Sequence, residues 1–314
     1  MIKSSMLIHP DELSKTWIDR LANAGIEAIG IHPRGGKNAD RSLKNLLEQM
    51  ETNKFCDLID YARGKGLEVE YEFHAMSYLL PRALFDTHPE YFRVNKDGER
   101  TREYNFCVSN SDAMMLVSKN AAELAASLYK SSRNFYFWLD DGWDLKCHCP
   151  LCKHLSASDQ QIIVLNHILR EIKKQRPDAR MAYLAYMDTV VPPTHTDIED
   201  GIFLEYAPFA KYTVSKDKAE LIEKEKEMMI PLMRVFDKHP PKVLEYWYDN
   251  SLFSKWKKPP QKFVLDESTM RSDIEEYKRA GFDSISTFAC FLGEDYESLH
   301  GNIDIIPFSN AVSK

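Results

Sequence analysis

Carboxylate side chains stand at the ends of three apolar segments whose pattern predicts β-strands. Asp140 and Asp141 end one segment, and Glu205 and Glu245 lie in two others. Cleavage of a glycosidic bond needs one carboxylic acid to protonate the leaving oxygen, and a second group to stabilise or attack the sugar carbon. Neighbouring strand residues point to opposite faces, so only one of Asp140 and Asp141 needs to face a pocket. Asp141 lies further out, at the loop, so the candidate catalytic residues are Asp141 as the acid, with Glu245 or Glu205 as its partner.

Histidines and flat aromatic rings occur at the same strand ends. Sugars stack their C–H faces on aromatic rings, while fixed polar groups bind their hydroxyls. The candidate substrate-binding residues are His9, His32, His74, Trp138, Trp143, Tyr186, Tyr246 and Trp247. Two plainer interpretations stay open, namely that the carboxylates are structural partners of Lys or Arg, and that the 246–248 run packs strand against helix.

The elements that must position these residues alternate between strand and helix. Eight short apolar segments are expected to be strands, at 4–9, 28–32, 67–74, 134–140, 180–186, 201–206, 242–248 and 284–289. The helical stretches that precede three of them close with Gly25, Gly66 and Gly281, because glycine tolerates the left-handed conformation that ends a helix. Eight strands alternating with helices predict one (β/α)8 TIM barrel over residues 1–314.

Two connections in this pattern are long, at 75–111 after the third strand and at 141–157 after the fourth. Both follow a strand, so both belong to the face where such barrels build their active sites. A doubly wound sheet is the main alternative fold. It would usually place a glycine-rich turn after the first strand to bind a dinucleotide, and the chain has His9, Pro10, Asp11 and Glu12 there.

A cysteine cluster is the sharpest local motif. Cys147, Cys149 and Cys152 place three thiols in one short loop. Zinc takes four ligands tetrahedrally, with sulfur or imidazole preferred, so the motif predicts a structural zinc ion and no catalytic cofactor. The fourth ligand would be Cys107, His148 or His154. The alternative is a set of reduced cysteines, or one disulfide among them.

Composition excludes several classes of protein. The formal net charge is −7, and no basic stripe suggests a nucleic-acid partner. No apolar run approaches the length of a membrane helix. The apolar part of residues 1–8 is too short for a signal peptide, so the chain as it stands is expected in the cytoplasm, and secretion would need a signal outside these residues.

Several motifs together resemble a bacterial family catalogued as domain of unknown function 4838. They are the stretches 105–110, 141–143, 147–153, 182–186 with Pro192 and Pro193, 244–248 and 251–253. The resemblance implies a barrel similar to glycoside hydrolases, some of which are endo-β-N-acetylglucosaminidases acting on N-glycans. It also implies a mechanism in which the substrate acetamido group is the nucleophile, one carboxylate is the acid and a second orients the acetamide.

The sequence therefore predicts a glycosidase that takes a carbohydrate substrate, with N-acetylhexosamine-containing glycans as the implied class. Two other functions stay open. A non-catalytic carbohydrate-binding barrel would keep the aromatic rings without a converging pair of carboxyls. A metal-dependent hydrolase would use His9, His32 and His74 as ligands.

Overall fold

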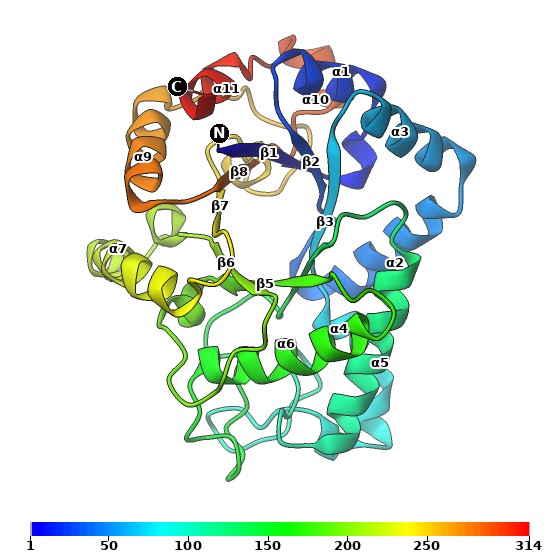
Figure 1. Ribbon diagram of the computed structural model, residues 1–314, viewed down its shortest axis with the longest axis vertical. Coiled ribbons are helices and arrows are strands. Elements are labelled where there is room, and N and C mark those ends of the chain that lie inside the picture. Colours follow the sequence, from blue (N-terminus) through cyan, green and yellow to red (C-terminus); the bar gives the residue numbers. More distant parts are fainter. Residues whose placement is uncertain (1, 314) are drawn as a thin grey trace.

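Eight parallel strands close into a barrel in the computed structural model, which describes residues 2–313. Each strand pairs with the next along the chain, and the eighth pairs with the first, so the sheet has no free edge (Figure 1). The strands are β1 (Lys3–Ile8), β2 (Ala28–Ile31), β3 (Glu68–His74), β4 (Asn134–Trp138), β5 (Arg180–Ala185), β6 (Ile202–Tyr206), β7 (Lys242–Glu245) and β8 (Ser284–Phe288). All eight predicted strands are confirmed.

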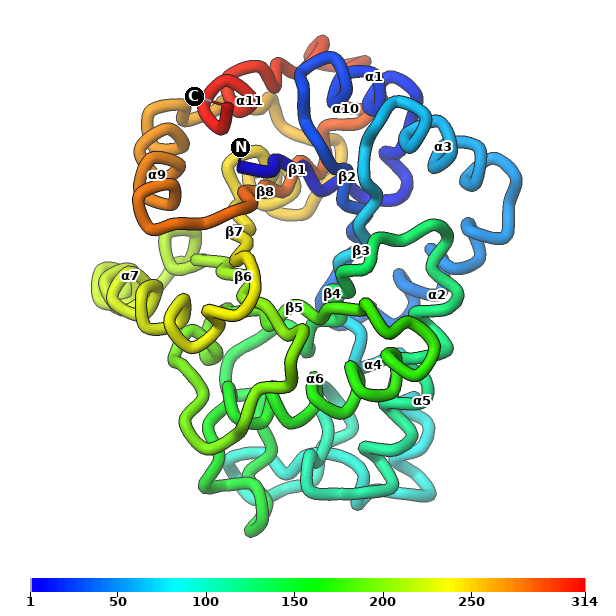
Figure 2. Tube along the Cα trace, in the orientation of Figure 1, coloured from blue at the N-terminus to red at the C-terminus, as the bar shows by residue number. Residues whose placement is uncertain are grey.

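Helices cover the outside of this barrel. Within residues 2–313 they are α1 (Lys15–Asn23), α2 (Ala39–Met50), α3 (Asn53–Gly64), α4 (Met76–Leu79), α5 (Ser111–Ser127), α6 (Ala157–Lys173), α7 (Lys218–Val235), α8 (Asn250–Phe253), α9 (Glu267–Ala280), α10 (Glu294–His300) and α11 (Ile306–Ser313). None of these helices is long and apolar enough to cross a membrane. The tube in Figure 2 follows the chain from β1 to α11, which packs against β1 and α9.

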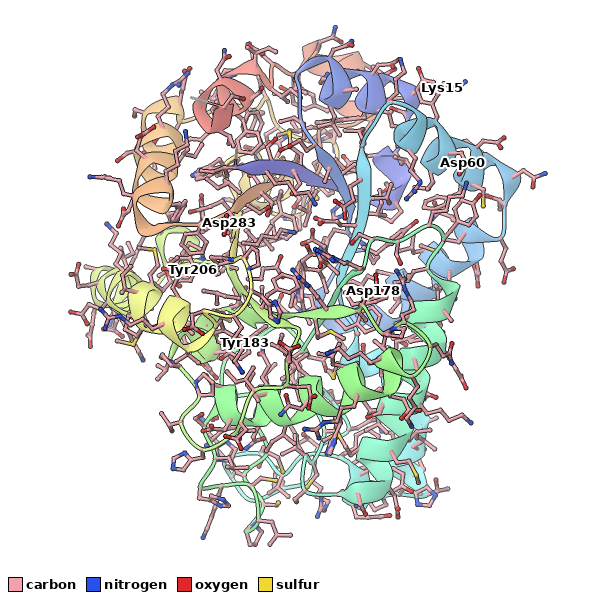
Figure 3. All side chains as sticks on the ribbon, viewed as in Figure 1. Lys15, Asp60, Asp178, Tyr183, Tyr206 and Asp283 are labelled. Atoms are coloured by element: carbon pink, nitrogen blue, oxygen red, sulfur yellow. The ribbon has the colours of Figure 1, made fainter. Side chains whose placement is uncertain are left out.

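The packing layer between strands and helices is apolar and aromatic. Tyr183 on β5 stacks on Phe236 at 4.6 Å, and the Tyr206 hydroxyl donates to the carbonyl of Glu225 on α7 (both tyrosines are labelled in Figure 3). The predicted glycine at the end of α9, Gly281, has a φ of +97° and donates its N–H to the carbonyl of Tyr277. This left-handed residue turns the chain into β8, as the sequence pattern indicated.

The two long connections after β3 and β4 lie together. The backbone N–H of His148 donates to the carbonyl of Val94 at 2.8 Å, and Asp140 donates its N–H to the side chain of Asn105 at 2.9 Å. In Figure 1 both segments extend from the barrel beside α5 and α6. The long loops expected after the third and fourth strands are thus confirmed, and each is held in place by the other.

Candidate functional site

A cavity of about 400 Å³ opens at the carboxyl ends of the strands. Its size lies in the range of small-ligand pockets. Seven of the strands contribute a residue that belongs to them or directly follows them, and the segment after β6 contributes Phe209. The lining includes His9, His32, Arg34, His74, Trp138, Asp141, Leu184, Tyr186, Phe209, Leu244, Tyr246, Asp249, Trp256, Phe288, Cys290 and Phe291. The fold therefore gathers segments that are far apart in the sequence around one mouth.

Asp141 lines this cavity, whereas Asp140 does not. Asp140 instead receives a hydrogen bond from the Arg82 guanidinium at 2.6 Å and borders a separate small hollow of about 50 Å³. The preference for Asp141 over its neighbour thus agrees with the geometry. Its half-buried carboxylate lies close enough to Tyr186 to raise the pKa of that phenol, after the larger effect of burial.

Asp249 is a second carboxylate on the same cavity, and sequence reasoning did not single it out. It follows β7 and caps α8, because its Oδ1 accepts hydrogen bonds from the backbone N–H groups of Ser251 and Leu252 and from the Ser251 hydroxyl at 2.5 Å. Burial raises its pKa to about 6, against the lowering effect of these hydrogen bonds. Within residues 2–313 no cation forms an ion pair with it.

Tyr246 lies on the same cavity, near enough to both carboxylates to be affected by their charges. Burial raises its pKa well above the ordinary value, and the charges of Asp141 and Asp249 both add to the shift. Its ring stacks on Phe288 at 5.0 Å, which gives the cavity an apolar wall. Tyr246 and Tyr186, both predicted to bind substrate, therefore lie beside the acidic groups.

The three predicted histidines form another wall. In each, Nδ1 lies against a backbone carbonyl, that of His32 for His9 (2.8 Å), Glu72 for His32 (2.8 Å) and Leu139 for His74 (2.5 Å). A carbonyl only accepts, so Nδ1 carries the proton and Nε2 is left as an acceptor. Burial lowers the pKa of His9 to about 4 and also lowers the pKa of His32 well below its ordinary value, so both rings are neutral at pH 7.

A catalytic metal on the three histidines finds no support in this arrangement. In the described chain, the side chains whose ligand atoms are close enough to share an ion are the four cysteines of the predicted cluster and the set His9, Glu12 and Cys290. In that second set, Glu12 already accepts hydrogen bonds from three backbone N–H groups. The neutral imidazoles of His9 and His32 are instead suited to accept hydrogen bonds from ligand hydroxyls.

Glu205, one of the expected catalytic groups, lies below the cavity floor and not in it. Its strand partner is Lys242, the first residue of β7, so it sits at mid-height in the barrel. Trp138 separates it from the cavity and donates its indole N–H to Glu205 at 2.7 Å. The expectation that Glu205 contacts the substrate is therefore wrong, because the residue lies too deep in the barrel. The sequence pattern alone does not determine this depth.

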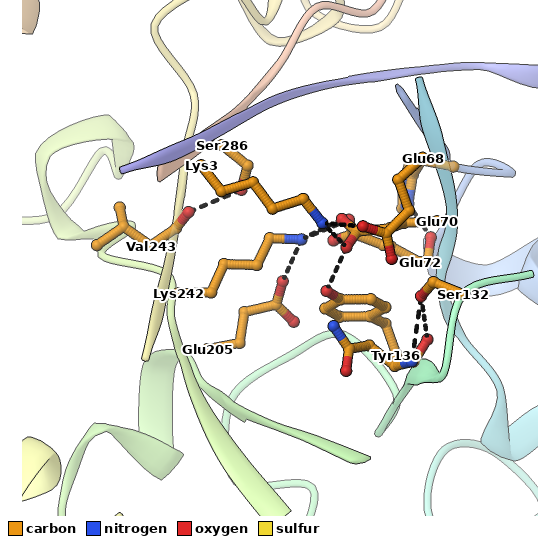
Figure 4. A network of polar contacts seen from close by, with 12 residues as sticks. Lys3, Glu68, Glu70, Glu72, Ser132, Tyr136, Glu205, Lys242, Val243 and Ser286 are labelled. Atoms are coloured by element: carbon orange, nitrogen blue, oxygen red, sulfur yellow. Dashed lines mark hydrogen bonds and ion pairs between the residues drawn. The ribbon is translucent and has the colours of Figure 1, made fainter. Parts of the chain in front are cut away.

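Glu205 belongs to a charged network that fills the barrel interior (Figure 4). The Lys242 ammonium lies 2.6 Å from Glu72, 3.2 Å from Glu70 and 3.4 Å from Glu205. Burial favours the neutral form of each acid, yet Lys242 and Lys3 hold the pKa of Glu70 at about 2. For Glu72 and Glu205 the effect of burial exceeds that of Lys242, so their pKa values are raised. Barrel interiors are usually apolar, so this network shows why an acidic residue in a strand is a weak signal for catalysis.

Glu245 points away from the cavity, which corrects its expected role as the partner of Asp141. Its carboxylate accepts hydrogen bonds from Lys211 at 2.6 Å and Tyr277 at 2.5 Å, in the layer between β7 and α9. Trp247 shares this outer face and donates its indole N–H to Asp273 at 2.9 Å. The alternation of side chains explains both errors, since Leu244 and Tyr246 face inward.

Trp143, also expected to bind substrate, lies outside the cavity lining and is 48% exposed. Aromatic residues outside the predicted set line the cavity instead, among them Trp256 and Phe291. Their φ angles are +54° and +62°, in a region that bulky residues rarely adopt. Such strained backbone is concentrated at binding sites, where surrounding structure holds it.

The profile of a family described as Domain of unknown function (DUF4838) matches residues 41–282, well over half of the chain. The chain belongs to this family. A search of curated protein sequences gave no significant match.

The fold of this DUF4838 protein is similar to that of barrel glycoside hydrolases. A β-galactosidase from Rahnella sp. R3 matches with a TM-score of 0.60 at 12% identity, over 99% of this chain and 55% of that one. A family 5 glycoside hydrolase from Prevotella bryantii B14 matches with a TM-score of 0.54 at 11% identity, over 96% and 86%. The pneumococcal exo-β-D-N-acetylglucosaminidase StrH gives 0.51 at 10% identity, over 99% and 83%.

These likenesses establish a glycoside hydrolase-like barrel. The chain spans about half the length of the β-galactosidases from Rahnella and Marinomonas that it matches.

Proposed function

We propose that this protein is a glycoside hydrolase, with Asp249 as the acid and Asp141 as the charged group that stabilises the developing positive charge on the sugar. The observation that carries the proposal is the presence of two carboxylates from separate loops on one aromatic cavity. Hydrolysis of a glycoside uses a pair of carboxyl groups that flank the bond being cleaved.

The roles follow from the two environments. Asp249 is 7% exposed and its pKa is raised to about 6, so it holds a proton in mildly acidic solution. Asp141 is half-buried beside the loop and has better access to water than Asp249. A buried acid beside a better solvated carboxylate is the arrangement that separates proton donor from charge stabiliser. This reverses the acid role expected for Asp141.

N-acetylhexosamine-containing glycans are the substrate class that we propose. The resemblance described above implies that some members of the family act on such glycans, and the structurally similar StrH is named as an exo-β-D-N-acetylglucosaminidase. The cavity offers the acceptor Nε2 atoms of neutral histidines for sugar hydroxyls. The stacked rings of Tyr246 and Phe288 would contact the apolar faces of the sugar and its acetamido methyl group.

The test is a screen of chromogenic N-acetylhexosaminides and glycoprotein N-glycans with the wild type, Asp141→Asn, Asp249→Asn and the control Glu245→Gln. We expect the wild type and the control to cleave a common substrate, and both aspartate variants to bind it with little cleavage. Cleavage that survives in both aspartate variants would refute the assigned pair. Glycan binding without any cleavage by the wild type would establish the non-catalytic carbohydrate-binding barrel.

A further inference from the structure

Four buried cysteines from two separate loops meet at one point beside the barrel. Cys107 comes from the connection after β3, and Cys147, Cys149 and Cys152 come from the connection after β4. Their sulfur atoms all lie within 4.8 Å of one another. The Sγ of Cys107 is 3.7 Å from that of Cys149 and 4.0 Å from that of Cys152.

We propose that these four cysteines bind a structural zinc ion. Four sulfurs placed tetrahedrally about 2.3 Å from zinc are separated from one another by about 3.8 Å, close to the two separations above. A disulfide would need about 2.05 Å between sulfurs, and all four cysteines are free thiols. The sulfurs are therefore already spaced for a metal ion and too far apart for a disulfide.

The structure also selects the fourth ligand among the three that the sequence left open. His154 is exposed, and His148 lies outside the group, with its Nε2 2.8 Å from the carboxylate of Asp144. Cys107 completes the set instead. A closed site of four thiolates has no position for substrate, so the ion has a structural role and not a catalytic one.

The surroundings of the cluster are those of a metal site and not of a plain apolar core. The N–H of Val94 donates to the Cys147 sulfur at 3.4 Å, and the Ser109 hydroxyl lies 3.2 Å from the Cys107 sulfur. Such contacts stabilise thiolates in the second shell of a metal. The side chain of Gln160 on α6 exchanges hydrogen bonds with the Cys147 backbone at 2.8 and 2.9 Å.

A buried positive charge lies beside the cluster. Arg93 is 7% exposed, and its guanidinium donates to the carbonyls of Asp144 and Lys146, next to Cys147. Its Nε has no hydrogen-bond partner among the described residues. Zinc with four thiolates carries two net negative charges, and this guanidinium partly offsets them. With four neutral thiols, the same buried charge would have no counter-charge in the cluster.

The ion would join the two long loops at the cavity. Asn105, two residues before Cys107, accepts a hydrogen bond from the N–H of Asp140 at 2.9 Å and donates to the carbonyl of Leu145 at 3.3 Å. Asp140 precedes Asp141 in the same loop. Zinc would therefore hold the segment that presents Asp141, and this part of the inference rests on the proposed function.

Metal analysis of the full-length protein, purified without chelators, tests the site independently of activity. We expect one zinc ion per chain, and a cobalt-substituted protein with the visible spectrum of tetrahedral cobalt bound to four thiolates. Cys107→Ser should lose most of the zinc, whereas Cys56→Ser, which alters a cysteine outside the cluster, should keep it. Absence of zinc and of cobalt uptake by the reduced wild type would overturn the proposal, whether or not any variant folds.

Limited proteolysis tests the link to the loop. Removal of the metal from the wild type should expose Lys146 and Lys153 to trypsin, and restored zinc should protect them again. Metal binding with unchanged proteolysis would refute the role in holding the loop and leave the site itself in place. Neither result depends on cleavage of a glycan, so failure of the proposed function would be recognised separately.

Discussion

Glu245 and Asp249 lie four residues apart at the end of β7, and both are buried carboxyls whose pKa values are raised by burial. Their partners differ. Glu245 faces α9 and is neutralised by Lys211 at 2.6 Å. Asp249 faces the cavity and has only the hydroxyl and N–H donors of its own helix cap. A place at a strand end therefore does not identify a catalytic acid. Structural acids and candidate catalytic acids differ in their bonding partners and in whether the carboxyl faces the cavity.

The largest expected effect concerns Asp249→Asn. General acid catalysis contributes about 10²- to 10⁴-fold, so kcat should fall by at least about 100-fold. Asn caps a helix about as well as Asp, which keeps α8 intact. Steady-state kinetics beside a melting curve measures both properties. A wild-type kcat in a folded variant would place Asp249 with Glu245 as a purely structural acid.

The stability of the same variant should depend on pH in a defined direction. Because the pKa of Asp249 is raised to about 6 in the folded protein, from about 4 in an unfolded chain, its ionisation destabilises the fold as pH rises through this range. Asn cannot ionise. At pH 8 we therefore expect Asp249→Asn to melt no lower than the wild type, and at pH 4 the difference should shrink. The raised pKa would be contradicted if the melting temperature of the variant, compared with that of the wild type at the same pH, were lower at pH 8 than at pH 4.

Glu245→Ala should lower stability and leave catalysis unchanged, in contrast to Asp249→Asn. The change leaves Lys211 with Asp273 as its remaining acidic partner and removes the acceptor of the Tyr277 hydroxyl. Loss of one partner of a buried ion pair costs about 3 kcal/mol. Denaturant unfolding should show this loss of stability, while kcat per folded molecule stays near that of the wild type. A large fall in kcat with unchanged stability would return Glu245 to the catalytic site.

Tyr246 faces the cavity and Trp247 faces the helix layer, so they offer the same comparison as Asp249 and Glu245. The expected effects on KM and on stability are smaller. Tyr246→Ala removes a ring from the cavity wall and should raise KM about tenfold, since one aromatic contact contributes about 1.4 kcal/mol. Trp247→Phe removes the hydrogen bond to Asp273 and part of a buried ring that packs on Tyr277 and Phe308, so stability should fall by at least about 1 kcal/mol with KM unchanged. Equal effects of the two changes on KM would show that both faces of this segment contact substrate.

The sequence predicted the barrel well because its signals are local and repeated. Each strand is a short apolar segment, and Gly281 ends α9 in the left-handed conformation that the pattern required. The cysteine motif was equally local, and Cys107 was among the residues expected to complete it. The preference for Asp141 over Asp140 came from its position further out, in the loop, and Asp141 is the one that lines the cavity.

The site residues that could not be predicted depend on how deep a side chain lies in the barrel and on the residue at which a strand ends. β7 ends at Glu245, three residues earlier than expected, so strand ends did not mark which side chains reach the mouth. Glu205 has the correct inward direction but lies level with the start of β7, which only the strand register reveals. Asp249 lies beyond the strand, where alternation no longer applies. It caps α8, and nothing in the local sequence indicated a cavity.

The pH dependence of kcat/KM in the wild type tests the central claim most directly. An acid works in its protonated form, so the rate should fall about tenfold per pH unit above pH 6, because the pKa of Asp249 is about 6. In Glu245→Gln, kcat/KM should fall above pH 6 as it does in the wild type. A kcat/KM that rises as the pH passes 6 would contradict the assignment of Asp249 as the acid. So would a fall whose midpoint shifts to another pH in Glu245→Gln.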